Sequence, residues 1–190
     1  MKRYKVYSEE TPFYYSTSTI VNWIPVFQKD NYFQIIIDSL KYCQEHKGLL
    51  LHGYVIMPTH IHLLSSHSQI QTLPEIMRDF KHFTSSEIIK SLERENHEYY
   101  LSLFRNNASN RSRNQQYKVW KDDYHPIAIK SSKWFLEKLT YMHYNPVRKG
   151  FVELPEHWKY SSARNWELDD HSIIEIQKLD IVSTVGAEAL

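Results

Sequence analysis

The sequence contains a single cysteine, Cys43, which excludes an intrachain disulfide and fits a reducing compartment. No apolar run approaches the roughly 18 residues that are needed to span a bilayer. The first residues, MKRYKVYSEE, lack the apolar stretch of a secretory signal peptide. We therefore expect a cytoplasmic protein that has no membrane partner.

The chain also lacks a strong charge imbalance, since its formal net charge is +1 at pH 7. Overall charge therefore does not indicate a nucleic-acid partner, but the charges are unevenly distributed. The segment 105–133 contains seven lysines and arginines against two aspartates. A local basic patch attracts phosphate even on a neutral protein, although such a segment can equally be a solvated loop.

Apolar and aromatic residues are abundant, with 42% hydrophobic content and 14 tyrosines, 8 phenylalanines and 5 tryptophans. This content is enough for one domain with a substantial core. We expect that domain over residues 1–168 and a C-terminal tail of unknown role over 169–190. Most aromatic residues belong in the core, and others are able to stack on unpaired bases.

Hydrophobic periodicity and breaker residues divide the chain into strands and helices. The expected elements are strands over 13–23, 49–57 and 60–67, short strands within 117–120 and 125–130, a loop over 105–116, and helices over 29–47, 72–93 and 131–145. This order predicts an α+β protein of the ferredoxin-like split βαβ type, with an antiparallel sheet and helices packed on one face.

Two histidines, His60 and His62, flank Ile61 in a segment that reads as a buried strand. Side chains two residues apart on a strand point the same way, so both imidazoles share one face while Ile61 points into the core. That geometry suits two ligands of one metal. Such a pair also occurs by chance and in metal hydrolases, so it does not define the chemistry without further groups.

The expected helix over 131–145 carries a second set of reactive side chains. Phe135, Leu139 and Met142 form a stripe that should face the core. Tyr141 and Asn145 lie about 100° from that stripe, one turn apart. A phenol has an ordinary pKa near 10, so Tyr141 would attack well only if it is deprotonated or if its target is activated.

The segment YVIMPTHIHLL, followed far downstream by YMHYNPVRKGFVELPEHWKYSSARNW, resembles the single-tyrosine HUH transposases, most closely their REP-associated branch. The resemblance covers roughly residues 10 to 165. The two histidines alone are a weak signal, but their combination with the Y-x-x-x-N-P-V-R-x-G element is specific.

The resemblance implies a metal-dependent enzyme that cuts and rejoins single-stranded DNA, with hairpin or palindromic repeat DNA as its substrate, through a 5′-phosphotyrosine link. His60 and His62 would hold Mg²⁺ or Mn²⁺, and Tyr141 would be the nucleophile. Asn145 stands where related transposases carry a polar metal ligand, often glutamine. Imidazole suits softer ions, so Mn²⁺ should work at least as well as Mg²⁺. The resemblance also implies a homodimer.

Phosphate contacts are expected from basic residues in two segments. The candidates are Arg111, Arg113, Lys118 and Lys121 in the basic segment, and Arg78 and Lys81 on the second long helix. The last two are weaker candidates, because exposed basic residues on a helix are usually just solvated.

Three other functions remain open at this point. The chain could be a catalytically silent DNA-binding protein on the same fold, or an unrelated metal hydrolase that uses the histidine pair. It could also be a replication-initiator or relaxase-type HUH nuclease, although those proteins share the chemistry without the NPVRKG element. Replacement of Tyr141 by phenylalanine separates the metal hydrolase from the tyrosine enzymes.

Overall fold

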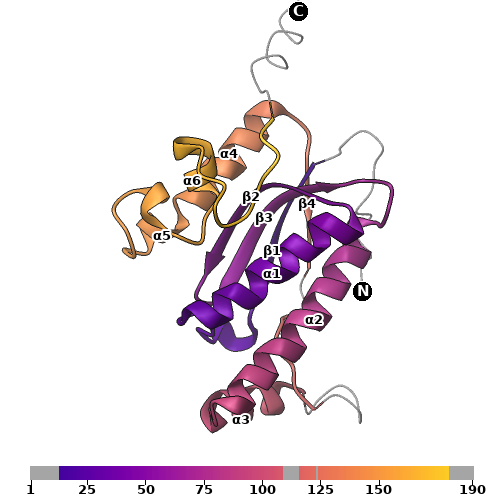
Figure 1. Cartoon of the computed structure of the whole chain (residues 1–190), viewed down its shortest axis with the longest axis vertical. Coiled ribbons are helices and arrows are strands. Elements are labelled where there is room, and N and C mark those ends of the chain that lie inside the picture. The colour runs from indigo at the N-terminus through magenta and orange to yellow at the C-terminus, as the bar shows by residue number, and fades with distance from the viewer. Residues whose placement is uncertain (1–12, 109–115, 123, 180–190) are drawn as a thin grey trace, which may run out of the picture.

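The computed structural model describes residues 13–108, 116–122 and 124–179 (Figure 1). Its centre is a four-stranded antiparallel sheet in the order β2-β3-β1-β4. The strands are β1 (Phe13–Thr19), β2 (Leu49–Met57), β3 (His60–His67) and β4 (Ile127–Ile129); the helices are α1 (Asp30–Lys47), α2 (Leu73–Arg94), α3 (Glu98–Ala108), α4 (Ser132–His143), α5 (Asn145–Arg148) and α6 (Ala163–Leu168); the short 3₁₀ helices are η1 (Val21–Trp23) and η2 (Pro155–His157). Because β3 lies between β1 and β2, the predicted α+β class with its split βαβ pattern is confirmed.

The first helix and the hairpin that follows it form where local sequence signals predict them. α1 ends at Gly48, whose φ of 78° is a left-handed conformation that glycine adopts without a steric penalty. Pro58 and Thr59 then turn β2 into β3, and the two strands pair so that Met57 lies opposite His60. The strand β3 carries the two histidines, and the turn therefore determines the residue at which this strand begins.

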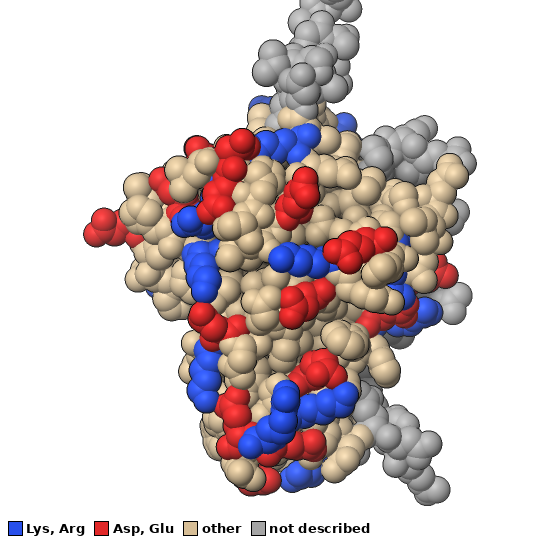
Figure 2. All heavy atoms as spheres, viewed as in Figure 1, with Lys and Arg blue, Asp and Glu red and all other residues tan. Residues whose placement is uncertain are grey.

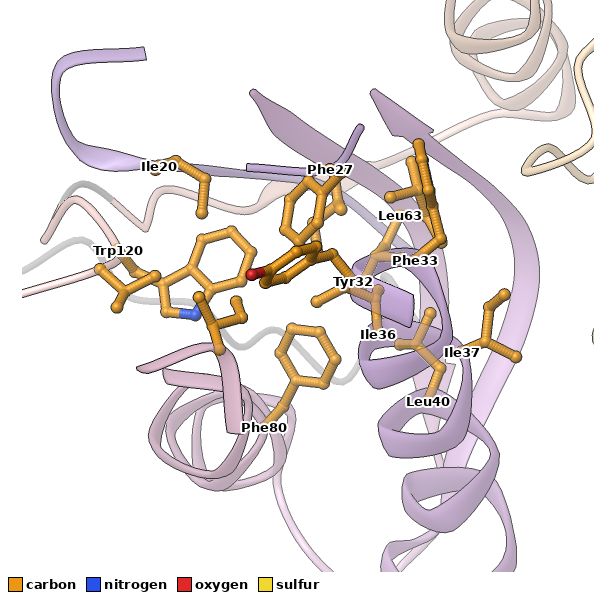
Figure 3. Packing of buried hydrophobic residues seen from close by; sticks show 14 of the residues in the cluster. Ile20, Phe27, Tyr32, Phe33, Ile36, Ile37, Leu40, Leu63, Phe80 and Trp120 are labelled. Atoms are coloured by element: carbon orange, nitrogen blue, oxygen red, sulfur yellow. The ribbon is translucent and has the colours of Figure 1, made fainter. Parts of the chain in front are cut away.

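Helices cover both faces of the sheet. α1 and α2 pack on one face, and Figure 1 shows α1 crossing in front of the strands. Leu63 points into this layer, where it meets the apolar stripe of α1 (Figure 3), and Ile61 belongs to the same buried cluster. α4 packs on the opposite face against Leu64 and Val55. The prediction that helices pack on one face therefore holds for α1 and α2, but not for α4.

α4 occupies the second face because residues of β2 and β3 make part of that face apolar as well. Val55 and Met57 of β2 and Leu64 of β3 are buried beneath the stripe of α4. A half-solvated antiparallel sheet would carry polar residues there. The buried stripe of α4 consists of Phe135, Leu139 and Met142, as predicted.

Several expected elements differ in the structure. The short strand expected within 117–120 is only an isolated bridge between Ile20 and Trp120, and the helix expected over 131–145 ends at His143. The first strand ends at Thr19 rather than residue 23, because Asn22 and Trp23 adopt positive φ angles of 52° and 56°. The expected loop over 105–116 begins instead as the end of α3, whose Phe104 and Ala108 are buried. Residues 109–115 lie outside the described residues.

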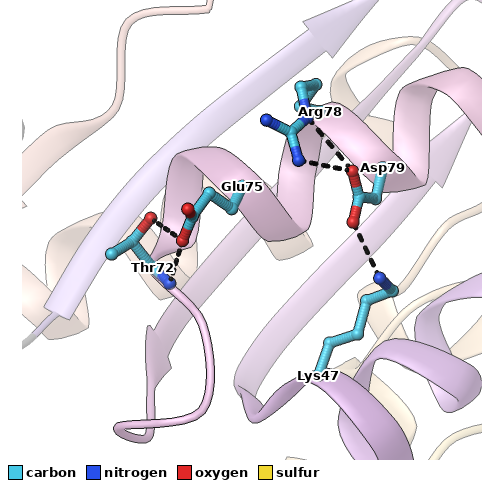
Figure 4. A network of polar contacts seen from close by, with 5 residues as sticks. All are labelled: Lys47, Thr72, Glu75, Arg78 and Asp79. Carbon is cyan, nitrogen blue, oxygen red and sulfur yellow. Dashed lines mark hydrogen bonds and ion pairs between the residues drawn. The ribbon is translucent and has the colours of Figure 1, made fainter.

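A polar network joins the start of α2 to the end of α1 (Figure 4). The backbone N–H and the hydroxyl of Thr72 both donate to Glu75 Oε2, at 2.9 Å and 2.6 Å. One turn later, Asp79 accepts from Arg78 and forms an ion pair with Lys47 at 2.7 Å. The predicted start of α2 after Thr72 is thus confirmed, and α2 is tied to α1 at this end.

The division of the chain at residue 168 stays a prediction, but the described part of the following segment is attached to the domain. Ile174 and Ile176 are buried in the main core, and the N–H of Gln177 donates to the carbonyl of Leu51 at 2.8 Å. Within the described residues, no helix has both the length and the apolar character of a membrane span.

Candidate active site

The two histidines of β3 lie side by side on the face that α4 covers. The ring centroids of His60 and His62 are 4.7 Å apart, and both side chains are buried. Ile61 between them points to the α1–α2 layer and is fully buried. Strand alternation therefore places two imidazoles on one face, as the two-residue spacing predicts.

Hydroxyl groups orient both imidazoles. His62 Nδ1 lies 2.8 Å from the hydroxyls of both Tyr15 and Thr17 on β1, and His60 Nδ1 lies 2.8 Å from the hydroxyl of Thr59. The opposite nitrogen of His62, Nε2, is buried and has no hydrogen-bond partner among the described residues. A buried polar atom without a partner costs free energy, so its environment calls for an explanation.

Both imidazoles are held in the neutral form. Burial, with a smaller contribution from the nearby Lys149 ammonium, lowers the pKa of His60 to about 4. Burial likewise lowers the pKa of His62 to about 3, with smaller contributions from His60 and Arg148. A neutral imidazole keeps a lone pair on one ring nitrogen, which is the form that binds a metal.

The tyrosine helix brings its phenol to the histidines within one chain. Tyr141 is 49% exposed, and its ring centroid is 6.2 Å from that of His62 and 6.4 Å from that of Tyr15. Packing of α4 on the sheet produces this contact, since Leu139 and Met142 on the neighbouring face of α4 are buried. The phenol of Tyr141 lies about 80 residues after the two imidazoles in the chain, and the three groups thus form one cluster.

Asn145 lies at the junction of α4 and α5. Pro146 lacks an N–H, so the α4 hydrogen bonding is interrupted at Tyr144 and a short helix resumes at Asn145. Asn145 is buried, and its Nδ2 donates to the backbone carbonyl of Tyr141 at 3.3 Å. The structure therefore attaches Asn145 to the backbone of Tyr141, while its role as a metal ligand stays a prediction.

A cation beside the phenol is a feature that sequence reasoning missed. The guanidinium of Arg148 lies 4.6 Å from the ring centroid of Tyr141 and also donates to the Tyr141 carbonyl. Lys138 lies on the other flank, 5.9 Å from the same ring. Arg148 follows Tyr141 by seven residues, which is two helical turns, and this spacing was a usable signal.

The donor set restricts how a metal could be held here. Among the described residues, no cluster of three or more histidine, cysteine, aspartate or glutamate side chains is suited to a metal. A metal at His60 and His62 would therefore take its remaining ligands from an amide, a phenol, water or a phosphate. The unpaired Nε2 of His62 is suited to bind such a metal, and a substrate phosphate is suited to complete the metal's ligands with oxygen atoms.

Four of the six predicted phosphate-binding residues line one cavity of about 720 Å³ between α2 and the segment 116–122. These residues are Arg78, Lys81, Lys118 and Lys121. The other two, Arg111 and Arg113, lie outside the described residues. By contrast, lysines and arginines are interspersed with aspartates and glutamates over the face shown in Figure 2.

The cations of this cavity differ in their own contacts. Arg78 forms an ion pair with Asp79 at 3.0 Å, and Lys118 forms one with Asp122 at 2.7 Å. Lys121 instead lies over the ring of Trp23, with Nζ 4.6 Å from the ring centroid. The side chain of Lys121 therefore extends from the cavity toward Trp23 of η1.

The cavity and the histidine pair meet at the end of β1. The N–H of Lys121 donates to the carbonyl of Thr19 at 2.8 Å, and Thr19 pairs with His60 across the sheet. The ring of Trp23 in turn lies 5.6 Å from the ring of His60. Trp23 and Lys121 therefore lie between His60 and the basic cavity.

Comparisons with known proteins agree with this arrangement. No protein-family model matches the chain. A Haemophilus influenzae protein named "Putative REP-associated tyrosine transposase" is 26% identical over 121 residues, and the match covers 62% of this chain and 61% of that protein. A solved structure of a REP-associated tyrosine transposase bound to a REP hairpin superposes with a TM-score of 0.62 at 15% identity, over 95% of this chain and 96% of the other.

The superposition shows that this chain has the fold of a tyrosine transposase. The named relative adds a similarity in sequence. The resemblance to the REP-associated tyrosine transposases, drawn above from two sequence motifs, is therefore confirmed in both sequence and fold.

Proposed function

We propose that this chain is a tyrosine transposase that cuts and rejoins single-stranded DNA, with hairpin or palindromic repeat DNA as its substrate. The observation that carries the proposal is the contact between Tyr141 and His62, 6.2 Å apart between ring centroids, beside the unpaired His62 Nε2. The named relative and the hairpin-bound neighbour support the class of substrate.

A divalent metal, Mg²⁺ or Mn²⁺, would be held by His60 and His62, with Asn145 as the proposed third ligand. When bound, such an ion would supply positive charge that stabilises the phosphate in the transition state. The hydroxyl oxygens of Tyr15 and Thr17 can accept a hydrogen bond from the Nδ1–H of His62, which leaves the Nε2 lone pair free for that ion.

Tyr141 would attack the scissile phosphate in line. The bond between its phenol oxygen and phosphorus forms as the bond to the 3′ oxygen breaks, the phenol proton passes to solvent, and the leaving oxygen takes up a proton as a 3′-OH. Arg148 and Lys138 flank the phenol and would hold the phosphate by charge. Attack by a 3′-OH on the phosphotyrosine reverses the step, so rejoining needs no ATP.

The protein offers a basic surface beside the site for the single-stranded DNA that extends from the scissile phosphate. Lys121 adjoins the strand partner of His60, and Lys81, Arg78 and Lys118 line the cavity beyond it. Cations that track a backbone beside aromatic side chains are typical of single-strand binding surfaces. These four residues are the proposed phosphate contacts.

The test incubates the protein with labelled single-stranded hairpin DNA and Mn²⁺ and measures a covalent protein–DNA adduct on a denaturing gel. Tyr144→Phe is a matched control, because Tyr144 is 45% exposed and lies in the same motif, close to Tyr141 in exposure. We expect the adduct in the wild type and in Tyr144→Phe, and none in Tyr141→Phe.

Other outcomes would contradict specific parts of the proposal. An adduct that survives in Tyr141→Phe and vanishes in Tyr144→Phe would move the nucleophile by three residues. Cleavage without any adduct would exclude the tyrosine mechanism, and binding without cleavage would favour a silent DNA-binding protein. Because Tyr141 meets His62 within one chain, the proposed reaction needs no residue from a second copy, and the homodimer stays a prediction.

A further inference from the structure

Trp23 is an exposed indole at the edge of the candidate active site. Its side chain is 54% exposed, although it stands between the buried residues Val21 and Ile24. Its ring lies 5.6 Å from that of His60, at an interplanar angle of 80°. Lys121 Nζ lies 4.6 Å from the centroid of the same indole. The indole thus connects a proposed metal ligand to the basic cavity.

The backbone that presents Trp23 is strained. Asn22 and Trp23 are consecutive residues without glycine, and both adopt left-handed φ angles, of 52° and 56°. A bulky side chain rarely adopts this conformation, and it persists only when the surrounding structure holds it. Here Ile20 and Ile24, both buried, hold the two ends of the turn. The strain gains no burial for the indole, which suggests that its exposed position has a use.

We propose that Trp23 stacks on an unpaired nucleobase of the DNA strand whose phosphate lies at His60 and His62, and that Lys121 contacts the phosphate of that nucleotide. This inference rests on the proposed function and adds a residue that positions the substrate. Stacking on an aromatic ring suits any base, because every base has a π face. The flexible stem of Lys121 allows its ammonium to move from the ring to a phosphate.

Position in the sheet supports this assignment. Lys121 is anchored through its N–H to Thr19, and Thr19 is the cross-strand partner of His60. The indole and the backbone of Lys121 therefore stand at fixed places beside the histidine, on the route toward the cavity. A base that stacks here would fix the register of the strand relative to Tyr141.

The experiment measures binding of a labelled DNA hairpin with single-stranded extensions of about ten nucleotides, in EDTA so that no cleavage occurs. We expect Trp23→Ala and Trp23→Gly to weaken binding about 5-fold to 100-fold, and Trp23→Phe to retain most of the affinity. Tyr99→Ala is the matched control, because Tyr99 is a 68% exposed aromatic on α3, and it should bind as the wild type does.

Trp23→Gly separates stacking from a structural role. Glycine adopts the φ of 56° without strain, so this variant should unfold at the wild-type temperature or higher while it still binds DNA weakly. Replacing each unpaired base in turn with 2-aminopurine should reveal one position whose fluorescence is quenched by the wild type and not by Trp23→Gly.

The outcomes distinguish this inference from the proposed function. If Trp23→Gly binds as the wild type does, or if its loss of binding follows a loss of folding, the stacking role is wrong. If the wild type and Trp23→Phe bind DNA, Trp23→Gly does not, and Mn²⁺ yields neither cleavage nor adduct, the stacking role stands and the proposed cleavage fails. If the wild type binds no single-stranded DNA, both are wrong.

Discussion

The hydroxyl pair on β1 should control how well His62 binds a metal. His62 Nδ1 has two partners at 2.8 Å, Tyr15 Oη and Thr17 Oγ1, and either oxygen can accept a hydrogen bond from Nδ1–H. Tyr15→Phe or Thr17→Val alone leaves one acceptor, so we expect each to weaken Mn²⁺ binding by less than about fivefold. The double variant removes both acceptors and should weaken it about 10-fold to 100-fold, or about 1.4 to 2.7 kcal/mol.

The double variant should also destabilise the fold, because it leaves a buried N–H without a partner, at a cost of about 1 to 3 kcal/mol. Mn²⁺ affinity is measured by titration calorimetry at neutral pH, and the free energy of unfolding by urea denaturation. Ser18→Ala is the control, since it removes another buried β1 hydroxyl that has no hydrogen-bond partner among the described residues. Wild-type Mn²⁺ affinity in the double variant would refute the reasoning.

Three further predictions follow from the same contacts. Lys121→Ala should weaken hairpin binding and reduce the slope of log K against log salt by about 1, and an unchanged slope would remove Lys121 from the phosphate contacts. Burial lowers the pKa of His52 below its usual 6.5, so the unfolded state takes up a proton that the folded state resists. His52 alone should therefore lower the free energy of unfolding by up to about 1.4 kcal/mol per pH unit as the pH drops below about 6.5, and urea denaturation should show a less steep total fall in His52→Gln. Ile61→Ala should destabilise the protein by about 2 to 5 kcal/mol in the same assay, because the fully buried Ile61 leaves a cavity; a loss below about 1 kcal/mol would contradict its core position.

Local patterns in the sequence were enough for the central elements of the fold. The bounds of β2 and β3, the end of α1 at Gly48 and the start of α2 after Thr72 all agree with turn residues, glycine and caps. These signals act over a few residues, so they can be read without tertiary contacts. The same local alternation was enough to predict that His60 and His62 share one face.

Two boundaries could not be read in this way. The β-branched and aromatic run over 13–23 continues through Asn22 and Trp23, yet the chain turns there with positive φ. Asparagine tolerates a positive φ but tryptophan rarely adopts one, so the local sequence was a weak signal for this turn, whose two ends are held by the buried Ile20 and Ile24. The start of the basic segment was predicted to be a loop because residues 105–116 are mostly polar. The buried side of α3 consists of apolar residues that lie mainly before this segment.

The sequence by itself determined the class of fold, the pairing of two imidazoles on one strand face, and the core stripe of α4. Only the tertiary structure decided that α4 covers the histidine face, that Tyr141 reaches His62 in the same chain, and that Arg148 flanks the phenol. Periodicity reports which way a side chain points from its own element. The face on which an element packs depends on contacts between residues far apart in the chain, and those contacts assemble the site.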